Sequence, residues 1–375
     1  MKIFEYSLKN LRHDFELILL DEWSKAYAFE GLFKFKLETE VPTKYLAGDY
    51  SFVVQKNSRR YSEKRPTDIQ KSSSIKPPFD EKKFNFTKIS PQEILLKLIN
   101  IDETERSDNL IIINNSPIEI GHCLICPKYN EKKNQVLDEY SIKLACHILK
   151  LIFSSNFLIG FNSISAYASV NHLHMHLYDL KQTCEFKINK KYLFPIQNCE
   201  KPQFYKNKIW FIDFNCYYRA CFCVELGAFE SPEQFSHKVF SIVNFLSQND
   251  IPHNAVFVKS KSFADQNETI KCFIWPKMAS SGCVVNLNIC FKDIPPNEKN
   301  LCFAITELSG HFILPFDKDF GSINEEFIID VARYVQPDNE KIMELKDKPI
   351  TLITYFWQIE FFNGCIGRTI LRKLS

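Results

Sequence analysis

The chain has 375 residues, of which 45% are hydrophobic and 14% aromatic, and its formal net charge is +2 at pH 7. This composition excludes an intrinsically disordered protein, and the small net charge predicts no nucleic-acid or acidic-membrane partner. The 13 scattered cysteines, the charged N-terminus and the lack of an apolar run of about 18 residues predict a reduced, cytoplasmic protein without a membrane span.

The first part of the chain contains a mixed N-terminal region and a basic segment. Residues 1–53 alternate between apolar and charged side chains, which predicts a mixture of strand and helix. Residues 54–88 are rich in Lys and Arg and contain Pro66, Pro77 and Pro78, so we expect a long basic loop. Such a loop either lies in solvent or forms a flap that brings positive charge to a phosphate-bearing ligand.

A more regular block of elements follows, and the second half of the chain repeats its order. In the first half, strands are predicted at 110–115, 120–128 and 157–162, and a helix at 133–155. In the second half, strands are predicted within 208–227, 254–260, 270–277 and 301–314, and helices from Ser231 and over 323–334. The repeat lies in the order of elements and not in the residues themselves, and it predicts an α+β fold.

One cysteine pair has the spacing of a metal or redox motif. Cys123 and Cys126 form a C-x-x-C, but no second C-x-x-C completes a zinc site. The surrounding segment has the pattern of a strand, in which residues three apart face opposite sides. We therefore predict no metal at this pair.

The most informative stretch is 169-SVNHLHMHLYDL-180, where His172, His174 and His176 alternate with apolar residues. In a strand, alternate side chains share a face, so the three imidazoles are expected to project together. Three explanations fit this pattern: zinc ligation, a nucleophilic imidazole that attacks phosphorus, or partnered histidines on an exposed strand.

The segments that flank the histidines carry a family resemblance. The element 121-GHCLICPK-128 precedes 162-NSISAYASVNHLHMH-176, and a helix is predicted between them. This combination resembles the histidine triad superfamily of nucleotide hydrolases and transferases. The length of the chain is similar to that of the branch with galactose-1-phosphate uridylyltransferase, in which two triad-like halves lie in one chain.

Within that branch, several segments between about residues 30 and 315 resemble the GDP-D-glucose phosphorylases. These segments are KRPTDIQ, PFDEKKFNFTKI, SPIEIGHCLICP, PHNAVF and ELSGH. The resemblance implies a histidine-triad-like fold of two related halves, each with an antiparallel sheet and a long helix. The expected division is a catalytic half at 1–200, which includes the basic loop 54–88, and a second half at 201–375.

The resemblance also implies roles for individual residues. His174 is expected to attack GDP-glucose and form a GMP-histidine intermediate, which inorganic phosphate then discharges as GDP. His172, His176 and His122 are expected to contact the phosphate or the transferring GMP. The expected neutral donors are Asn162 and Ser169, and the expected cations are Arg65, Lys83 and Lys88. No cofactor and no metal are predicted.

The second half lacks the H-x-H-x-H pattern and is predicted to be non-catalytic. His253 and Asn254 stand where a second unit would carry its upstream histidine, and Glu307 and His311 either line the sugar site or pack in the core. Three alternatives remain open: a GDP-L-galactose phosphorylase, a nucleotide-sugar hydrolase, and a nucleotide-binding sensor on an inactive scaffold. The third histidine position is usually Gln in the plant GDP-L-galactose enzymes, and here it is His176.

Overall fold

The structure is a computed structural model, and it describes most of the chain. The described residues are 2–37, 41–63, 74–104, 106–180, 193–277, 284–286, 300–314, 320–321 and 323–334. Arg65 and the C-terminal segment 335–375 lie outside the described residues. No helix within the described ranges is long and apolar enough to cross a membrane.

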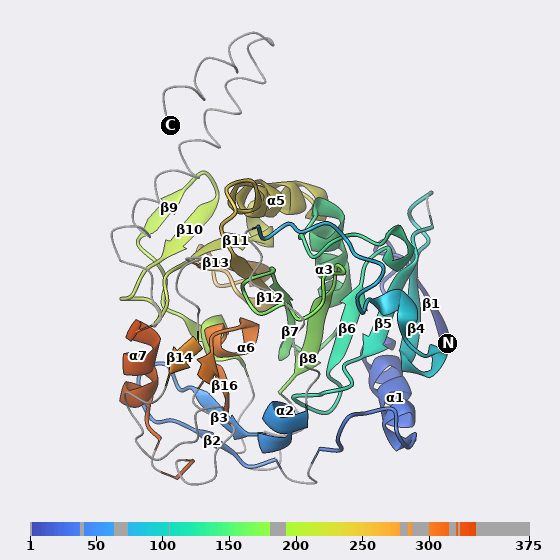
Figure 1. Cartoon of the computed structure of the whole chain (residues 1–375). Coiled ribbons are helices and arrows are strands. Elements are labelled where there is room, and N and C mark those ends of the chain that lie inside the picture. Colours follow the sequence, from blue (N-terminus) through green and yellow to red (C-terminus); the bar gives the residue numbers. More distant parts are fainter. Residues whose placement is uncertain are drawn as a thin grey trace.

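The described residues form a large sheet of 11 strands that runs through both halves of the chain (Figure 1). In spatial order the strands are β1 (Lys2–Tyr6), β4 (Ile94–Asn100), β5 (Asn109–Ile113), β6 (Cys123–Cys126), β8 (Met175–Asp179), β7 (Phe157–Asn162), β12 (His253–Lys261), β13 (Glu268–Pro276), β11 (Cys221–Glu225), β10 (Ile209–Ile212) and β9 (Phe204–Lys206). Neighbouring strands are antiparallel, apart from the parallel pair of β1 and β4.

The same succession of elements occurs twice along this sheet. The first half runs β5, β6, helix α3 (Glu139–Leu151), β7 and β8, and the second runs β10, β11, helix α5 (Pro232–Gln248), β12 and β13. The spatial order is mirrored about the pair of β7 and β12, which are antiparallel neighbours. The two halves therefore meet at the middle of one continuous sheet.

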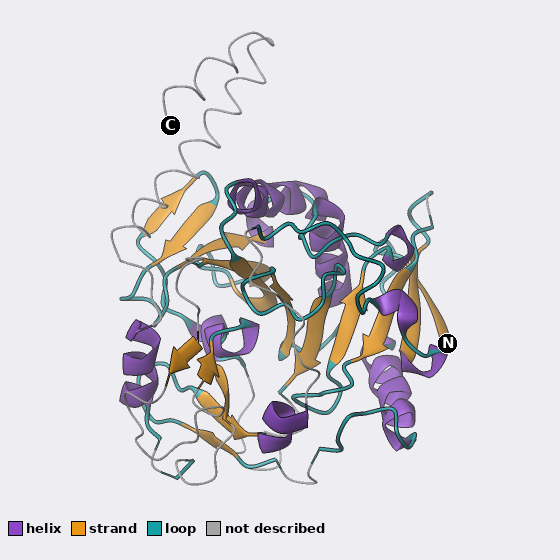
Figure 2. Ribbon diagram, in the orientation of Figure 1, coloured by secondary structure: helices purple, strands orange, loops and turns teal. Residues whose placement is uncertain are grey.

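Three helices cover one face of the sheet. Helices α3, α5 and α1 (Phe15–Ala28) pack there on a core that includes Leu173 and Met175, which separate the three histidines (Figure 2). The Ser231 hydroxyl accepts the Gln234 N–H at 3.3 Å, so the predicted start of α5 is confirmed.

The opposite face carries the histidines and is covered by smaller elements. These are a sheet of β2 (Thr43–Tyr45), β3 (Val53–Lys56) and β16 (His311–Leu314), helix α6 (Ile305–Leu308) and helix α7 (Glu325–Tyr334). A two-stranded sheet of β14 (Val284–Asn286) and β15 (Asn300–Cys302) completes the strands, and 3-10 turns lie at Phe86–Lys88, Pro91–Glu93, Tyr129–Glu131, Pro195–Asn198 and Leu226–Ala228.

Three expected elements differ from the structure. The helix expected over 133–155 begins only at Glu139, because the Asp138 side chain accepts the Ser141 N–H at 2.8 Å and caps it there. The strand expected over 301–314 is split into β15, α6 and β16. In the histidine segment, only residues from Met175 onward form the strand β8, so His172 and His174 precede it.

The prediction that residues 54–88 form a single basic loop is wrong. It contains the end of β3 and a short helix, α2 (Ser58–Glu63). Its last part is tied down by polar side chains from distant segments. Asp250 accepts the Ile75 N–H at 3.1 Å, and the Asn171 amide donates to the Pro77 carbonyl at 3.1 Å. This part of the segment therefore crosses the beginning of the histidine segment.

At Gly160 on β7 the cover lies close against the histidine face. Gly160 lies opposite His176, and a Cβ added there would come within 2.3 Å of Ile305 Cδ1. We expect Gly160→Val to lower the free energy of unfolding by about 1–3 kcal/mol, because the new methyl groups force α6 away from the sheet. Urea denaturation measures this change. Gly321→Val is the matched control, since a Cβ there meets nothing within 4 Å. Equal stability of both variants would contradict the close packing.

Candidate active site

His174 is held in one tautomer by its own backbone segment. Its Nδ1 lies 2.8 Å from the carbonyl oxygen of His172, and a carbonyl only accepts, so Nδ1 carries the proton. Its Nε2 therefore keeps a lone pair and has no hydrogen-bond partner among the described residues. Burial lowers the pKa of His174 to about 4, so the ring is neutral near pH 7. This is the form that a nucleophilic imidazole requires.

A buried glutamine fixes the backbone on which His174 stands. Gln135 Oε1 accepts the His174 N–H at 2.9 Å, and Gln135 Nε2 donates to the carbonyls of His174 and Asn162 at 3.0 and 2.9 Å. The Leu173 N–H donates to the Lys133 carbonyl at 2.9 Å. Residues 133–135 thus anchor the histidine segment where β8 has not yet begun, which explains why they are not helical.

Two successive hydrogen bonds, from Ile118 to His122 and from His122 to His176, determine the tautomers of both histidines. The Ile118 N–H donates to His122 Nδ1 at 3.0 Å, so the proton of the neutral His122 ring is on Nε2. His122 Nε2 lies 3.1 Å from His176 Nδ1, which must accept. The His176 proton is then on Nε2. His174 and His176 are therefore neighbours of opposite type, one with a lone pair on Nε2 and the other with an N–H there.

His172 differs from its expected role as a phosphate contact. Its Nδ1 accepts the Phe86 N–H at 3.1 Å, and its Nε2 donates to the Tyr129 carbonyl at 3.1 Å. Both ring nitrogens are thus bonded to backbone groups. The Phe86 ring also lies edge-on to His174, with centroids 5.0 Å apart. In this arrangement His172 ties the segment around Phe86 to the site and supplies the carbonyl that orients His174.

The two expected neutral donors lie in different surroundings. Asn162 is buried at the end of β7, and the Ile305 N–H donates to its Oδ1 at 3.3 Å. Its Nδ2 donates to no described residue. Ser169 is exposed in the loop before the histidines, and its hydroxyl has no hydrogen-bond partner among the described residues. Both side chains therefore retain donors for a ligand.

The expected cations are placed less favourably than one that the sequence did not single out. Lys83 is exposed, and Lys88 Nζ donates to three carbonyls of its own loop, those of residues 81–83. Arg60 on α2 instead lies close to the histidine cluster, where it donates to the Ser116 carbonyl. Burial and then His174 lower the pKa of His176, and the Arg60 charge adds to this effect.

Residues from the second half lie over the same face. Glu307 on α6 is buried, and burial raises its pKa, while Thr306 and the Ala304 N–H donate to it at 2.6 and 3.0 Å. His311 on β16 is fully buried and neither ring nitrogen has a partner among the described residues. The hydroxyl of Tyr178, whose ring centroid lies 6.2 Å from that of His311, is likewise unpartnered.

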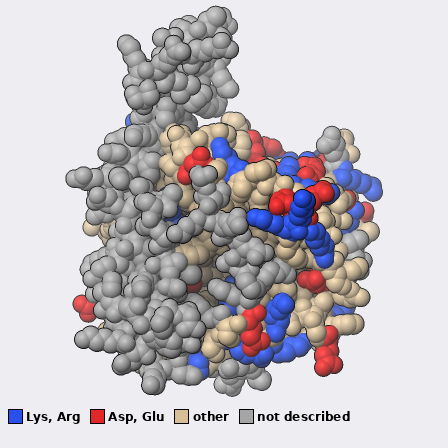
Figure 3. All heavy atoms as spheres, viewed as in Figure 1, with Lys and Arg blue, Asp and Glu red and all other residues tan. Residues whose placement is uncertain are grey.

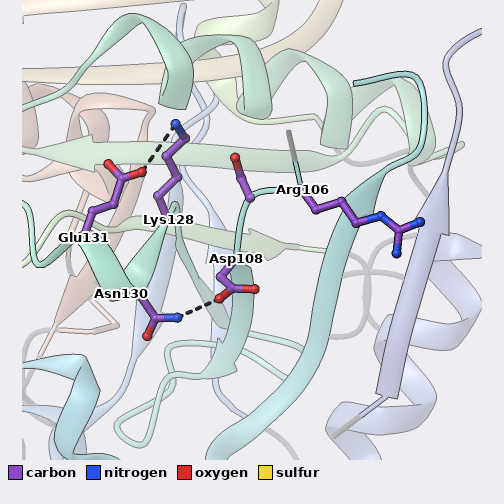
Figure 4. A pocket seen from close by; sticks show the side chains of 6 residues that line it. Arg106, Asp108, Lys128, Asn130 and Glu131 are labelled. Atoms are coloured by element: carbon purple, nitrogen blue, oxygen red, sulfur yellow. Dashed lines mark hydrogen bonds and ion pairs between the residues drawn. The ribbon is translucent and has the colours of Figure 1, made fainter. Parts of the chain in front are cut away.

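A surface pocket lies beside the turn that contains Tyr129, between residues 106–108 and 128–131. It has a volume of about 400 Å³ and is lined by Arg106, Ser107, Asp108, Lys128, Asn130 and Glu131 (Figure 4). Part of its charge is already paired, since Lys128 lies 3.4 Å from Glu131 and Asn130 donates to Asp108 at 2.6 Å. Figure 3 shows Lys and Arg interspersed with Asp and Glu across the described part of this face. Neither feature indicates a binding site for a strongly charged ligand.

Sequence reasoning found the histidines but missed Gln135 and Arg60. Gln135 was placed in the expected helix, and no motif marks it. Arg60 stands in the basic segment, where Arg65, Lys83 and Lys88 were equally visible. Arg60 lies near the site because it stands on the short helix α2, whereas the prolines of that segment predict a loop.

The chain was compared with known proteins. The family model described as "GDPGP1-like, N-terminal domain" matches residues 14–178, and "GDPGP1-like, C-terminal domain" matches residues 198–354. GDP-D-glucose phosphorylase 1 of Danio rerio is 27% identical over 345 residues, which cover 90% of each chain. GDP-L-galactose phosphorylase 2 of Arabidopsis thaliana is 28% identical over 346 residues, covering 88% of this chain and 74% of the plant protein.

Among solved structures, yeast Ap4A phosphorylase Apa2 in complex with AMP resembles this fold, with a TM-score of 0.54 and 13% identity. The match covers 86% of this chain and 96% of the yeast chain. This likeness confirms a mixed α+β fold of the type found in that phosphorylase. The two family models follow one another in order and together match most of the residues, and the chain belongs to the GDPGP1-like family.

Proposed function

We propose that this protein is a GDP-D-glucose phosphorylase, an enzyme of the nucleotidyltransferase class. It converts GDP-glucose and inorganic phosphate to GDP and glucose 1-phosphate. The observation that carries this proposal is the hydrogen bond from His174 Nδ1 to the His172 carbonyl, which leaves Nε2 as a free nucleophile in a neutral ring. Proteins named GDP-D-glucose phosphorylase 1 from Danio rerio and Homo sapiens, each 27% identical, support the substrate.

The reaction proceeds in two displacements at the same phosphorus. The lone pair of His174 Nε2 attacks the α-phosphorus of GDP-glucose, and the bond from this phosphorus to the bridging oxygen breaks. Glucose 1-phosphate leaves with that oxygen and its electron pair, and GMP stays on Nε2 through a P–N bond. An oxygen of inorganic phosphate then attacks the same phosphorus, the P–N bond breaks, and GDP leaves. One difficult step is thereby replaced by two easier ones.

Donors around His174 stabilise the charge that develops on the phosphoryl oxygens. The His176 Nε2–H and the Asn162 amide are neutral donors of fixed orientation, and the Ser169 hydroxyl is available at the edge of the site. Arg60 supplies a positive charge beside them. Phosphoryl transfer depends mainly on such positioning and charge stabilisation. We give His172 a positioning role, because both of its nitrogens are engaged.

The unpartnered polar groups above the histidine face fit a sugar. His311 and the Tyr178 hydroxyl are buried without partners among the described residues, and such groups are destabilising by about 1–3 kcal/mol each unless a ligand or water satisfies them. Glu307, whose pKa burial raises, lies in the same layer. Hexose hydroxyls both donate and accept, so we assign this layer to the glucose moiety.

We also propose that residues 1–200 and 201–375 form two related triad-like halves. The repeated order of strands around α3 and α5, mirrored about β7 and β12, supports a common origin. The second half then contributes the cover of the site and not a second nucleophile. A cytoplasmic location is in keeping with eight free cysteines among the described residues.

GDP-L-galactose phosphorylase is the second candidate, since the Arabidopsis thaliana relatives are as similar as the animal ones. The histidine at position 176 favours the first candidate, because that position is usually Gln in the plant enzymes. Incubation with GDP-glucose, GDP-L-galactose and GDP-mannose, each with and without phosphate, tests the proposal. We expect GDP to form fastest from GDP-glucose and only with phosphate. GMP formation without phosphate would instead indicate a hydrolase.

Replacement of the nucleophile is the sharpest test of the site. We expect His174→Asn to reduce turnover by at least about 10,000-fold, because no other described group presents a lone pair to the same phosphorus. Initial rates of GDP formation measure the loss, and circular dichroism confirms the fold. The matched control is His237→Asn, since His237 is exposed on α5 across the sheet and should keep the wild-type rate. A His174→Asn rate within about 20-fold of the wild-type rate would remove the nucleophile assignment.

The covalent intermediate is expected to accumulate when phosphate is absent. Mass spectrometry of enzyme mixed with GDP-glucose should then find one GMP on the peptide containing residues 172–176. The adduct should be lost in acid and kept in base, as a P–N bond requires. Added phosphate should release it as GDP, and added glucose 1-phosphate should regenerate GDP-glucose. Direct in-line transfer between the substrates predicts no adduct at any time and no burst.

The pH dependence of the first half-reaction should reflect the depressed pKa of His174. Because its pKa is about 4, the ring stays neutral as the pH falls from 8 to about 5, and the rate of glucose 1-phosphate release should change little. Between the His174 pKa of about 6.5 in the unfolded chain and its lower pKa in the folded protein, the unfolded chain binds more protons. The free energy of unfolding therefore decreases as the pH is lowered through that window. Unfolding is therefore monitored at each pH. An acid limb centred near pH 6.5 in folded protein would contradict the burial of His174.

A further inference from the structure

We propose that Asn254, in the second half of the chain, is a positioning residue that holds the amide nitrogen of Asn162 toward the reacting phosphorus. This inference rests on the proposed function and adds a residue that touches neither the nucleophile nor the substrate. Asn254 is fully buried on β12, directly opposite Asn162 on β7.

Two backbone groups fix the orientation of both amides. Asn254 donates to the carbonyl of Ala166 at 2.9 Å, so the atom at that position is nitrogen, because a carbonyl only accepts. The same nitrogen lies 2.5 Å from the Asn162 side chain, which must therefore present its oxygen. The Ile305 N–H also points at this oxygen, at 3.3 Å. A flipped Asn162 amide would bring its NH2 group against both donors.

The nitrogen of Asn162 consequently faces the nucleophile. The register of β7 and β8 pairs Gly160 with His176, and its continuation places Asn162 opposite His174. Gln135 Nε2 bridges the carbonyls of Asn162 and His174, which supports the same pairing. Opposite residues of antiparallel strands share a face with Cβ atoms about 5 Å apart. Asn162 Nδ2 donates to no described residue and is left for an oxygen of the phosphoryl group.

The orientation of the Asn162 amide decides whether this side chain attracts or repels the phosphoryl oxygen. With Nδ2 toward the phosphorus, Asn162 donates to an oxygen that gains negative charge during transfer. With Oδ1 in that place, a partial negative charge would face the same oxygen. One such donor is worth roughly 100-fold or more in rate when it is aimed at developing charge.

The hydrogen bonds of Asn254 indicate that this position requires a donor. Its Nδ2 makes two hydrogen bonds, while its Oδ1 is buried without a partner among the described residues. An unsatisfied buried acceptor is destabilising. The side chain is thus used for its donors alone, as expected for a group that orients a neighbouring oxygen.

Asn254→Asp tests this inference, because it replaces the NH2 group with an oxygen of similar size. The ionised carboxylate of this variant only accepts, so Asn162 turns to donate to it and presents Oδ1 to the substrate. The protonated carboxyl donates again and restores the wild-type orientation. We expect GMP-enzyme formation at saturating GDP-glucose, without phosphate, to be about 100-fold slower than the wild type at pH 8.5. At pH 5.5 the ratio of the wild-type rate to the variant rate should be at least about 10-fold smaller than at pH 8.5. The substrate concentration that gives half-saturation should change little.

Two further variants make the result specific. Asn162→Asp should be slow at pH 8.5, because two donors fix one of its oxygens and the other oxygen, which only accepts when ionised, faces the substrate. Asn254→Thr, whose side chain is too short to reach Asn162, should be about 10-fold slower at every pH and serves if Asn254→Asp does not fold. A ratio for Asn254→Asp that is the same at pH 8.5 and 5.5, or an unaltered rate in Asn254→Thr, would overturn the inference. Failure of the proposed function is distinct, since the wild type would then form no GMP-enzyme.

Discussion

The hydrogen bond from His174 Nδ1 to the His172 carbonyl is the interaction on which the rest of the site depends. Either ring nitrogen of a neutral histidine can carry the proton. The 2.8 Å distance from His174 Nδ1 to the His172 carbonyl oxygen places the proton on Nδ1. The carbonyl is itself held, because the N–H of the same peptide group donates to Lys133. Gln135 then holds the two peptide groups on either side of His174, since it accepts the His174 N–H and donates to the His174 carbonyl. The proposed nucleophile is therefore oriented by backbone groups alone, without any contribution from a substrate.

Burial makes these commitments necessary. Taking an imidazole out of water disfavours its charged form and lowers its pKa, so His122 and His176 each have one nitrogen that donates and one that accepts. The Ile118 N–H, His122 and His176 form a chain in which each link defines the tautomer of the next. The outcome is two neighbouring histidines of opposite tautomer, one with a lone pair on Nε2 and the other with an N–H there. Protonation of His122 at Nδ1 would break its bond to the Ile118 N–H, and protonation of His176 at Nδ1 would break its bond to His122.

The alternation of His172, His174 and His176 with apolar residues predicts a shared face on a strand, but in the structure the strand β8 begins only at Met175. The strand pattern around the C-x-x-C was interpreted correctly, since Cys123 and Cys126 pack in cores on opposite sides of β6. Other features could not be predicted, because they arise from contacts distant in sequence. Gln135 matters only because residues 133–135 leave the helical path to pair with the histidine segment. The place of Arg60 depends on a short helix that propensity alone does not reveal.

The role of the second half follows from the continuity of the sheet. A smaller protein with the first half alone would expose the face on which the histidines stand. Here β12 pairs with β7 over five residues, so Asn254 is placed opposite Asn162 with the precision of a strand register and not of a loop contact. The same half lays α6 over Gly160, where any side chain larger than hydrogen would collide with Ile305. The second half, which lacks the H-x-H-x-H pattern, thus contributes a partner for Asn162 and a cover over Gly160.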